Sequence, residues 1–547
     1  MQKQLQQLGT LIFWVLLATI PVALLGLFFF WPLGVLLARG LGDPLSAAAV
    51  FAEARTLKVL SNTLLQALGA TMISVVIGVP AGFVTHCLRF PGVRLLRGLL
   101  MIPFIMPTVV VALAFGALYG PGGAFEWLGL DRSFILVLMA MAFFNITLIS
   151  RSTGSLWEVL DPRLTQAART LGASRWRAFR TVTLPQLLPA IASSAALVFF
   201  YCASSFGIVL ILGGRKFANL ESEIYTAATV FLDFETAIAL TLLQCVIVAA
   251  ALALSHRMRR RGEGLKLTVS QARQITVTDI PLLVATLAVL AVLQITPIIG
   301  LLVRSVKRDG RWTFENYRAL ATPMNNFGGS VLDAAVVSVR LAAIATVLTL
   351  VLAVPAAILA SRRPATRFGK LSVSAFDFAV MLPVGISAVT LGFGMLLAMH
   401  NPWGTTLDLR SSGLVIAIAQ TFGALPLVLR LLTPILRGVP KAQLEVAATL
   451  GASSVRRLFT VELPQLRHAL GVAAGFTFAI ALGEFGAASF LVRPGSTTLP
   501  VVIGQLASRP GDANYGTAIA AAVLLGVIAS TVMLMAELSS RKAHSFA

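Results

Sequence analysis

The chain has 547 residues, of which 57% are hydrophobic and 12% are charged. Ordinary soluble domains contain roughly 25% charged residues, so this composition excludes a conventional soluble enzyme. The net charge is +21, but long apolar stretches separate the Lys and Arg residues. This pattern indicates a membrane protein whose basic residues mark cytoplasmic loops, and not a protein that binds nucleic acid.

Twelve stretches of the sequence are apolar enough to cross a membrane, for which a helix needs about 20 residues. The first stretch has features of a signal peptide, but its length and the spans that follow favour an uncleaved helix. The expected spans cover residues 11–38, 60–86, 98–119, 134–150, 187–212, 236–255, 279–304, 332–360, 371–398, 412–429, 469–492 and 515–537.

The loops between these spans divide into two sets, which carry 28 and 14 Lys and Arg residues. Cytoplasmic loops are the ones enriched in Lys and Arg, so the first set, with both termini, is predicted to be cytoplasmic. The stretch Arg304–Arg318 is the exception, because its five basic residues fall on the opposite side. It indicates either an error in the seventh span or a surface with its own role.

The sequence also contains an internal duplication. Gln166–Leu187 and Glu445–Leu466 are identical at 13 of 22 positions, at an offset of 279 residues. The same offset pairs Ser205 with Glu484. The sequence therefore predicts two copies of a six-helix domain, 1–256 and 279–547, joined by a basic cytoplasmic linker at 257–278, with a translocation path between the two copies.

Each copy of the duplicated segment lies in a predicted cytoplasmic loop. Good helix formers precede Gly172 and Gly451, an amphipathic stretch follows each glycine, and a proline then marks the return to the membrane. The pattern predicts two helix–glycine–helix elbows. Such an elbow could lie on anionic lipid, but the identities kept by both copies favour docking of another protein.

The elbows match a known motif, E-A-A-x-x-x-G followed by L-P. This EAA motif resembles the coupling loop of membrane subunits of binding-protein-dependent ABC importers, although Gln166 and Val446 replace its Glu and Ala. The resemblance implies an all-α polytopic membrane protein with about twelve transmembrane helices, arranged as two six-helix type I (MetI-like) permease repeats. The coupling positions that it implies are Gln166, Ala167, Ala168, Gly172, Pro185, Glu445, Ala447, Ala448, Gly451 and Pro464.

The same resemblance implies partners and a location. Two copies of an ABC ATPase subunit would bind the elbows, and an extracytoplasmic binding protein would deliver substrate to a permease in the bacterial cytoplasmic membrane. The fused form resembles the permeases for thiamine and for ferric iron, in motifs such as Ser205-Phe206-Gly207, Glu221-x-Glu223 and Leu482-Gly483-Glu484. It implies a cationic substrate, with thiamine as the first expectation and ferric iron as the alternative.

Three polar residues in the spans are candidates for the translocation path. Ionisable groups in a span usually face a cavity or a partner, so Glu484 either lies beside the path or makes a structural contact, for instance with Arg340. Ser205 is its repeat counterpart. Asn145 in the fourth span is expected to make an interhelical hydrogen bond more readily than a substrate contact.

The sequence gives no sign of catalysis. It has no G-x-x-x-x-G-K-[S/T] motif, no nucleophile–base arrangement and no metal-ligand spacing among its three cysteines. We therefore expect no enzyme activity, cofactor or metal in this chain, with ATP bound by a partner subunit. A rival hypothesis, an ion-driven secondary transporter, requires several membrane-embedded acids or histidines, and mainly Glu484 and Asp377 are found.

Overall fold

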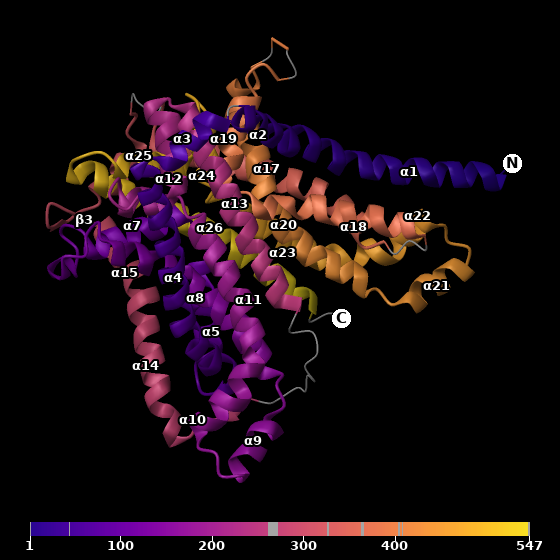
Figure 1. Cartoon of the computed structure of the whole chain (residues 1–547), viewed down its shortest axis with the longest axis horizontal. Helices are drawn as coiled ribbons and strands as arrows, with labels where there is room; N and C mark the ends of the chain where they lie inside the picture. Colours follow the sequence, from indigo (N-terminus) through magenta and orange to yellow (C-terminus); the bar gives the residue numbers. More distant parts are fainter. Residues whose placement is uncertain are drawn as a thin grey trace. The chain divides into compact units, whose positions relative to one another are not determined.

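The computed structural model describes residues 2–42, 44–260, 272–324, 328–362, 366–402, 405–406 and 408–544, and these are mostly helical (Figure 1). They form two compact units. Unit 1 consists of Met1–Asp43, Leu320–Ile503 and Leu524–Ala547, and unit 2 consists of Pro44–Ala319 and Gly504–Val523. Residues 261–271 of the expected linker lie outside the described residues.

Unit 2 is built on the first sequence repeat. Its helices are α3 (Pro44–Ala52), α4 (Ala54–Cys87), α5 (Val93–Leu99), α6 (Ile102–Ile105), α7 (Thr108–Tyr119), α8 (Phe134–Glu158), α9 (Pro162–Thr170), α10 (Arg175–Ala178), α11 (Leu184–Ala203), α12 (Leu220–Thr226), α13 (Phe234–Arg260), α14 (Ile280–Leu290), α15 (Thr296–Ser305) and α16 (Glu315–Arg318). Short strands β1 (Leu88–Arg89) and β2 (Arg273–Gln274) pair in parallel, and β3 (Lys307–Arg308) and β4 (Arg311–Trp312) form an antiparallel hairpin.

Unit 1 is built on the second repeat. Its helices are α1 (Gln2–Leu25), α2 (Trp31–Gly42), α17 (Val331–Ala360), α18 (Arg367–Met381), α19 (Ala388–Ala398), α20 (Leu414–Gly438), α21 (Lys441–Thr449), α22 (Ser454–Arg457), α23 (Leu463–Leu482) and α24 (Gly486–Leu491). Helices α25 (Leu499–Ala507) and α26 (Asp512–His544) contribute residues to both units. Single π-helical turns occur at Gly26–Phe30, Phe179–Thr183, Val209–Gly213, Ala227–Phe231, Ala291–Ile295 and Leu458–Glu462.

Eleven helices among the described residues are long and apolar enough to cross a membrane. They confirm the predicted all-α polytopic fold and coincide with eleven of the twelve expected spans. They are Ile12–Gly42, Ala54–Cys87, Phe134–Glu158, Arg175–Ala203, Phe234–Leu254, Val277–Ser305, Val331–Ala360, Arg367–Gly385, Leu414–Gly438, Ser454–Leu482 and Asp512–Ala536.

The third expected span, 98–119, does not form a single helix. It is divided among α5, α6 and α7, and the last of these begins at Thr108 after a break at Met106 and Pro107. Met106 has an extended backbone with ψ 130°, because a residue that precedes proline is pushed out of the helical region. The ninth span is also divided, into α18, a 3-10 turn at Leu382–Gly385 and α19, with an extended backbone (ψ 131°) at Ile386 between the turn and α19.

The division into units differs from the division of the sequence at 256 and 279. Helices α1 and α2 belong to unit 1, where they contact α17 and α19, although they precede the first repeat in the chain. Helices α14 and α15 belong to unit 2, where they contact α4 and α7. A sequence repeat identifies which segments were duplicated and not which helices pack together, so the predicted domain limits describe the repeat alone.

Close packing of α4 against α8 organises unit 2. Gly78 and Gly82 lie on the buried side of α4, one turn apart. A Cβ at Gly78 would stand 2.7 Å from Ile149 Cβ, and one at Gly82 would stand 2.8 Å from the Ser150 carbonyl oxygen. Small residues with this spacing let helix backbones approach closely in membranes. The pair therefore fixes the C-terminal part of α4 against α8, the helix that leads into the first elbow.

Candidate functional site

The first elbow lies at one end of unit 2, where α9 and α10 meet (Figure 1). Asp161 caps α9 by accepting a hydrogen bond from the Arg163 N–H at 2.9 Å. Helix α9 ends at Thr170, and Gly172, two residues later, has a left-handed backbone with a φ of +88°. The N–H groups of Gly172 and Ala173 donate to the carbonyls of Arg169 and Ala168, both at 3.0 Å, as in a Schellman C-cap.

The second elbow, in unit 1, repeats this geometry residue by residue. Gly451 has a φ of +81°, and its N–H donates to the Ala448 carbonyl at 3.0 Å. The next N–H, of Ala452, donates to the Ala447 carbonyl at 2.9 Å. The helix–glycine–helix shape predicted from the sequence is thus present in both repeats, with Pro185 and Pro464 in the first turns of α11 and α23.

Both elbows present the predicted coupling residues on the surface. Gln166, Gly172, Glu445 and Gly451 are exposed. Two further residues were missed: Leu171 and Leu450 are 89% and 81% exposed, although each is a large apolar side chain. Both precede the elbow glycine and are related by the repeat offset of 279, which is the signal that could have identified them. Exposed leucines at equivalent positions favour burial by a partner protein.

A row of aromatic rings attaches the first elbow to the membrane helices. The rings of Trp176 and Phe179 stack at 5.6 Å, and those of Phe179 and Trp157 stack at 5.7 Å. Trp157, in the last turn of α8, contacts Phe83 of α4 at 5.0 Å. The guanidinium of Arg273 lies 5.7 Å from the centre of the Phe83 ring. These contacts give the elbow a continuous packed connection to α4 and α8.

The second elbow is held by different chemistry. Arg362, at the end of α17, donates to the carboxylate of Glu462 at 3.0 Å through Nη1, and its guanidinium lies 4.7 Å from the centre of the Trp14 ring of α1. Glu462 is buried, with 7% of its side chain exposed. Phe13 of α1 contacts Phe459 with 6.2 Å between ring centres. The two elbows therefore share a backbone shape but not an anchor.

Of the three path candidates, Glu484 has the clearest structural role. It follows the end of α23, and its carboxylate accepts hydrogen bonds from the N–H groups of Ala487 at 2.7 Å and Ala488 at 3.0 Å. Arg340 forms no ion pair with Glu484 or any other residue that the structure describes. Glu484 thus caps α24, and whether it also lies on the path stays a prediction.

Asn145 and Ser205 of unit 2 both contact Cys202, Asn145 through its side chain and Ser205 through its N–H, which donates to the Cys202 carbonyl at 3.1 Å. Asn145 donates to the Met141 carbonyl at 2.8 Å and contacts Cys202 Sγ at 3.2 Å. The Ser205 carbonyl accepts from Asn219 at 2.6 Å. Within the described residues, Asn145 Oδ1 and Ser205 Oγ are buried and have no hydrogen-bond partner. Asn145 makes the expected interhelical contact and keeps one unused acceptor.

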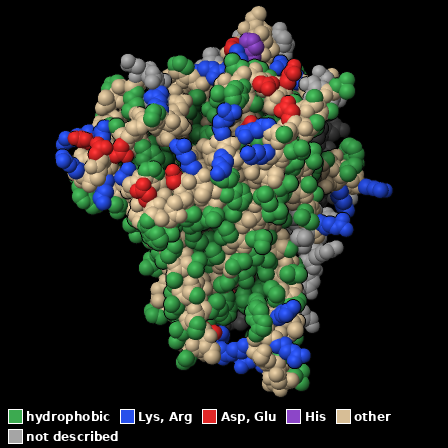
Figure 2. Space-filling view, turned by 60° about the vertical axis from the view of Figure 1, so that its left-hand side comes forward, with side chains coloured by type: hydrophobic (Ala, Val, Ile, Leu, Met, Phe, Trp, Pro, Cys, Tyr) green, Lys and Arg blue, Asp and Glu red, His purple; other side chains and the backbone are tan. Residues whose placement is uncertain are grey.

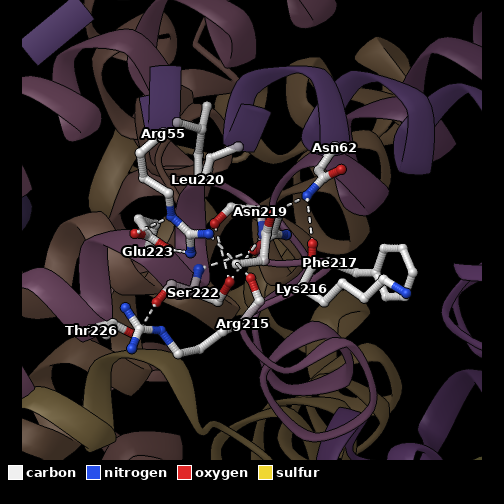
Figure 3. A network of polar contacts seen from close by, with 12 residues as sticks. Arg55, Asn62, Arg215, Lys216, Phe217, Asn219, Leu220, Ser222, Glu223 and Thr226 are labelled. Carbon is white, nitrogen blue, oxygen red and sulfur yellow. Dashed lines mark hydrogen bonds and ion pairs between the residues drawn. The ribbon is translucent and has the colours of Figure 1, made fainter. Parts of the chain in front are cut away.

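A polar network joins α12 to the start of α4 (Figure 3). The carboxylate of Glu223 accepts from Arg55 at 2.9 and 2.5 Å, and Asn62 donates to the Ala218 carbonyl at 3.0 Å. Asn219 and Ser222 form a reciprocal capping box at the start of α12. Helix α4 therefore holds the loop 215–219 in place through Asn62 and through Arg55, which Glu223 orients. Its partners on α4 are distant in sequence, so sequence reasoning missed them.

The basic stretch Arg304–Arg318 is partly neutralised. Arg304 donates to Asp512 at 2.9 Å, and Arg308 lies 3.5 Å from the Glu315 carboxylate. The hairpin of β3 and β4 carries Lys307, whose ammonium lies 4.5 Å from the centre of the Trp312 ring. These contacts give three of the five basic residues structural partners.

The surface of unit 2 near the first elbow is basic. Figure 2 shows Lys and Arg side chains gathered at the lower tip, where the elbow lies, below a surface dominated by hydrophobic side chains. Among the residues that the structure describes, no group of three or more His, Cys, Asp and Glu could hold a metal ion. A membrane face that ends in a basic loop is typical of the cytoplasmic side of a transport protein.

Comparisons with known proteins agree with this architecture. The family model described as "Binding-protein-dependent transport system inner membrane component" matches residues 74–260 and 353–545. The matches begin at 74 and 353, and 353 minus 74 is 279, the offset of the elbows. The chain is 28% identical to the thiamine transport system permease protein of Salmonella typhimurium over 533 residues, which are 94% of this chain and 95% of that protein.

Other relatives match less of the chain. The sulfate transport system permease protein of Escherichia coli is 35% identical over 159 residues, which are 28% of this chain and 57% of that protein. A chain of a bacterial ABC transporter that imports alginate is 18% identical, with a TM-score of 0.39, covering 48% of this chain and 98% of its own. The duplicated fold and the two family matches lead to one conclusion: the chain belongs to the family of binding-protein-dependent transport system inner membrane components, as a fused permease subunit of an ABC importer.

Proposed function

We propose that this permease imports thiamine. The observation that carries the proposal is the 28% identity with a thiamine permease, which extends over 94% of this chain and therefore over both repeats. Ferric iron is the alternative cargo that the fused architecture allows.

Uptake of radiolabelled substrates tests this proposal. Cells that lack their own thiamine importer would express the chain together with the binding protein and ATPase subunit of its source organism. We expect uptake of thiamine, and no uptake of ferric iron or of sulfate, the substrate named for the relative with 35% identity over a shorter region. Accumulation of iron or sulfate without thiamine would refute the assignment.

We further propose that the two elbows are the docking sites for two copies of an ABC ATPase subunit. The observation that supports this is their identical glycine turn, with Leu171 and Leu450 exposed beside it. Closure of the ATPase pair would be passed through Trp157 and through Arg362 to the membrane helices. An extracytoplasmic binding protein would deliver the substrate at the opposite side.

Co-purification with the ATPase subunit tests the docking sites. Replacing both Leu171 and Leu450 with Ser should release the ATPase, because the exposed leucines would supply the apolar contacts. A matched control replaces Leu188 of α11, which is 55% exposed but lies outside the elbow. Retention of the ATPase by the double variant, together with intact transport after replacing Gly172 and Gly451 by Val, would refute this role.

A further inference from the structure

A cavity of about 950 Å³ lies behind the first elbow, within unit 2. Its walls come from the end of α4, the last turn of α8, both elbow helices and residues 272–282. The volume falls in the range of small-molecule sites, roughly 300–1,000 Å³. Neither transport nor ATPase docking gives this cavity a role.

One wall is aromatic. Phe83, Trp157, Phe179 and Trp176 all line the cavity, and their rings follow one another at 5.0 to 5.7 Å. Such rings attract a ligand cation that lies over a ring face within about 6 Å. Trp176 is 69% exposed, so the wall is open to an entering molecule.

Some charged side chains of the cavity lining already have partners within the chain, and others form no ion pair among the described residues. Arg273 is neutralised by Asp279, through contacts of 2.7 and 2.8 Å, and Asp161 serves as the N-cap of α9. Arg175 donates to the neutral hydroxyl of Thr278. Neither Arg169 nor Glu158 forms an ion pair with any residue in the described part of the chain.

The guanidinium groups of Arg169 and Arg175 and the carboxylate of Glu158 are therefore available to a ligand, since none of them is in an ion pair within the described residues. Guanidinium groups bind phosphate oxygens in a forked geometry, and a carboxylate binds an ammonium group. The cavity therefore suits a group that carries both a phosphate and a positive charge.

The remaining wall is apolar and belongs to membrane-spanning helices. Val79 and Pro80 lie in the last turns of the Ala54–Cys87 span, and Leu282 lies in the first turns of the Val277–Ser305 span. Leu282 is 43% exposed. The cavity thus begins where two spans end, which is the depth of lipid headgroups.

We propose that this cavity binds one aminophospholipid. Its phosphate would accept hydrogen bonds from Arg169 and Arg175, and its ammonium group would lie between Glu158 and the Trp157 ring. Its acyl chains would follow the apolar wall of α4 and α14. This inference rests on the membrane location of the family and not on the identity of the cargo.

The second repeat provides an internal comparison, because it lacks this chemistry. The offset of 279 places Leu436, Arg437, Ala448, Ser454 and Val455 at the positions of Trp157, Glu158, Arg169, Arg175 and Trp176. A smaller, open cavity of about 590 Å³ at the second elbow is lined only by uncharged residues. The proposal therefore predicts one specific lipid per chain, at the first elbow.

Native mass spectrometry of the purified full-length chain tests the proposal. The chain would be delipidated and then titrated with phosphatidylethanolamine, phosphatidylglycerol or phosphatidylcholine. We expect retention of one phosphatidylethanolamine in preference to the other two. Replacing both Arg169 and Arg175 with Gln should weaken its binding at least about tenfold, since both phosphate donors are lost. Glu158→Gln should keep phosphate binding but lose the preference for phosphatidylethanolamine over phosphatidylglycerol.

Arg180→Gln is the matched control, because Arg180 is exposed in the same elbow but does not line the cavity. It should bind lipid as the unaltered chain does. Equal retention of the three lipids by the unaltered chain would overturn the proposal without reference to any variant. Displacement of the lipid by soluble O-phosphoethanolamine at equal concentration would also overturn it, since the site would then recognise a free phosphate ester.

Discussion

The packing of α4 against α8 predicts a sharp difference among three glycine substitutions on α4. A Cβ at Gly78 would stand 2.7 Å from Ile149 Cβ and 3.0 Å from the Ile146 carbonyl oxygen. At Gly82 it would stand 2.8 Å from the Ser150 carbonyl oxygen. Ordinary contacts between carbon atoms are about 3.5–4.0 Å, so Gly78→Ala or Gly82→Ala must push the helix backbones apart by roughly 1 Å.

The magnitude follows from that displacement. A gap of about 0.5–1 Å removes a quarter to a half of the dispersion energy at each separated contact, and overpacking of this kind costs about 1–3 kcal/mol. Because Ala favours the helix over Gly by about 1 kcal/mol, each Gly→Ala change in α4 also stabilises the helix by that amount, and this term cancels when the variants are compared. The packing cost alone should change the unfolding equilibrium about 5- to 150-fold.

Gly69→Ala is the control for this prediction. Its Cβ would meet only the terminal methyl groups of Leu138, at 3.0 and 3.2 Å, and these can rotate away. Equilibrium unfolding in mixed micelles, followed by tryptophan fluorescence, would measure the three variants. If Gly78→Ala and Gly69→Ala unfold at the same denaturant concentration, the close approach of α4 and α8 does not stabilise the unit, and the reasoning is refuted.

Three other substitutions test the anchors and the cap. Glu462→Ala should lower the free energy of unfolding by about 2–3 kcal/mol, which is less than the loss for a fully buried ion pair because Arg362 is partly exposed. Replacing Arg362 by Met together with Glu462 by Leu should recover the stability, as measured by thermal unfolding. Trp157→Ala should abolish stimulation of the ATPase by the loaded binding protein, whereas Trp157→Phe should retain it; equal stimulation in both would contradict a role of the aromatic row in coupling. Glu484→Gln keeps one acceptor for the α24 N–H groups, so it should cost about 0.5–2 kcal/mol and leave uptake proportional to the folded amount. A folded Glu484→Gln protein without uptake would instead assign this residue to the substrate path.

Hydropathy and the internal repeat predict most of the fold. A span in lipid must satisfy its backbone hydrogen bonds internally, so a long apolar stretch predicts a helix. The elbow shape was also predictable, because Gly172 and Gly451 occupy left-handed positions that favour glycine. Hydropathy alone reads 98–119 as one span, but Pro107 moves Met106 out of the helical region, so the local effect of a proline divides an apolar stretch that hydropathy joins.

The side-chain contacts that anchor the elbows could not be predicted from the sequence, for a different reason. Phe83 and Trp157 are 74 positions apart, and nothing in either local pattern indicates that their rings meet. An acid in a span is costly, so the sequence indicates that Glu484 needs a partner but does not identify it, and the structure shows its carboxylate bound to the N–H groups three and four residues later. Side-chain partners outside a helix depend on packing, which periodicity does not encode.

Helices α1 and α2 pack against helices of the second repeat, so their final contacts form late during synthesis of the chain. Helix α2 ends at Gly42, but the helices that it and α1 contact begin at Val331, about 290 residues later. At about 5–20 residues per second, the first two helices wait roughly 15–60 seconds in the membrane before their partners are synthesised. During that interval the faces that will contact α17 and α19 are open to lipid or to the insertion machinery. Helices α1 and α2 therefore cannot reach their final packing until the first helices of the second repeat have been synthesised.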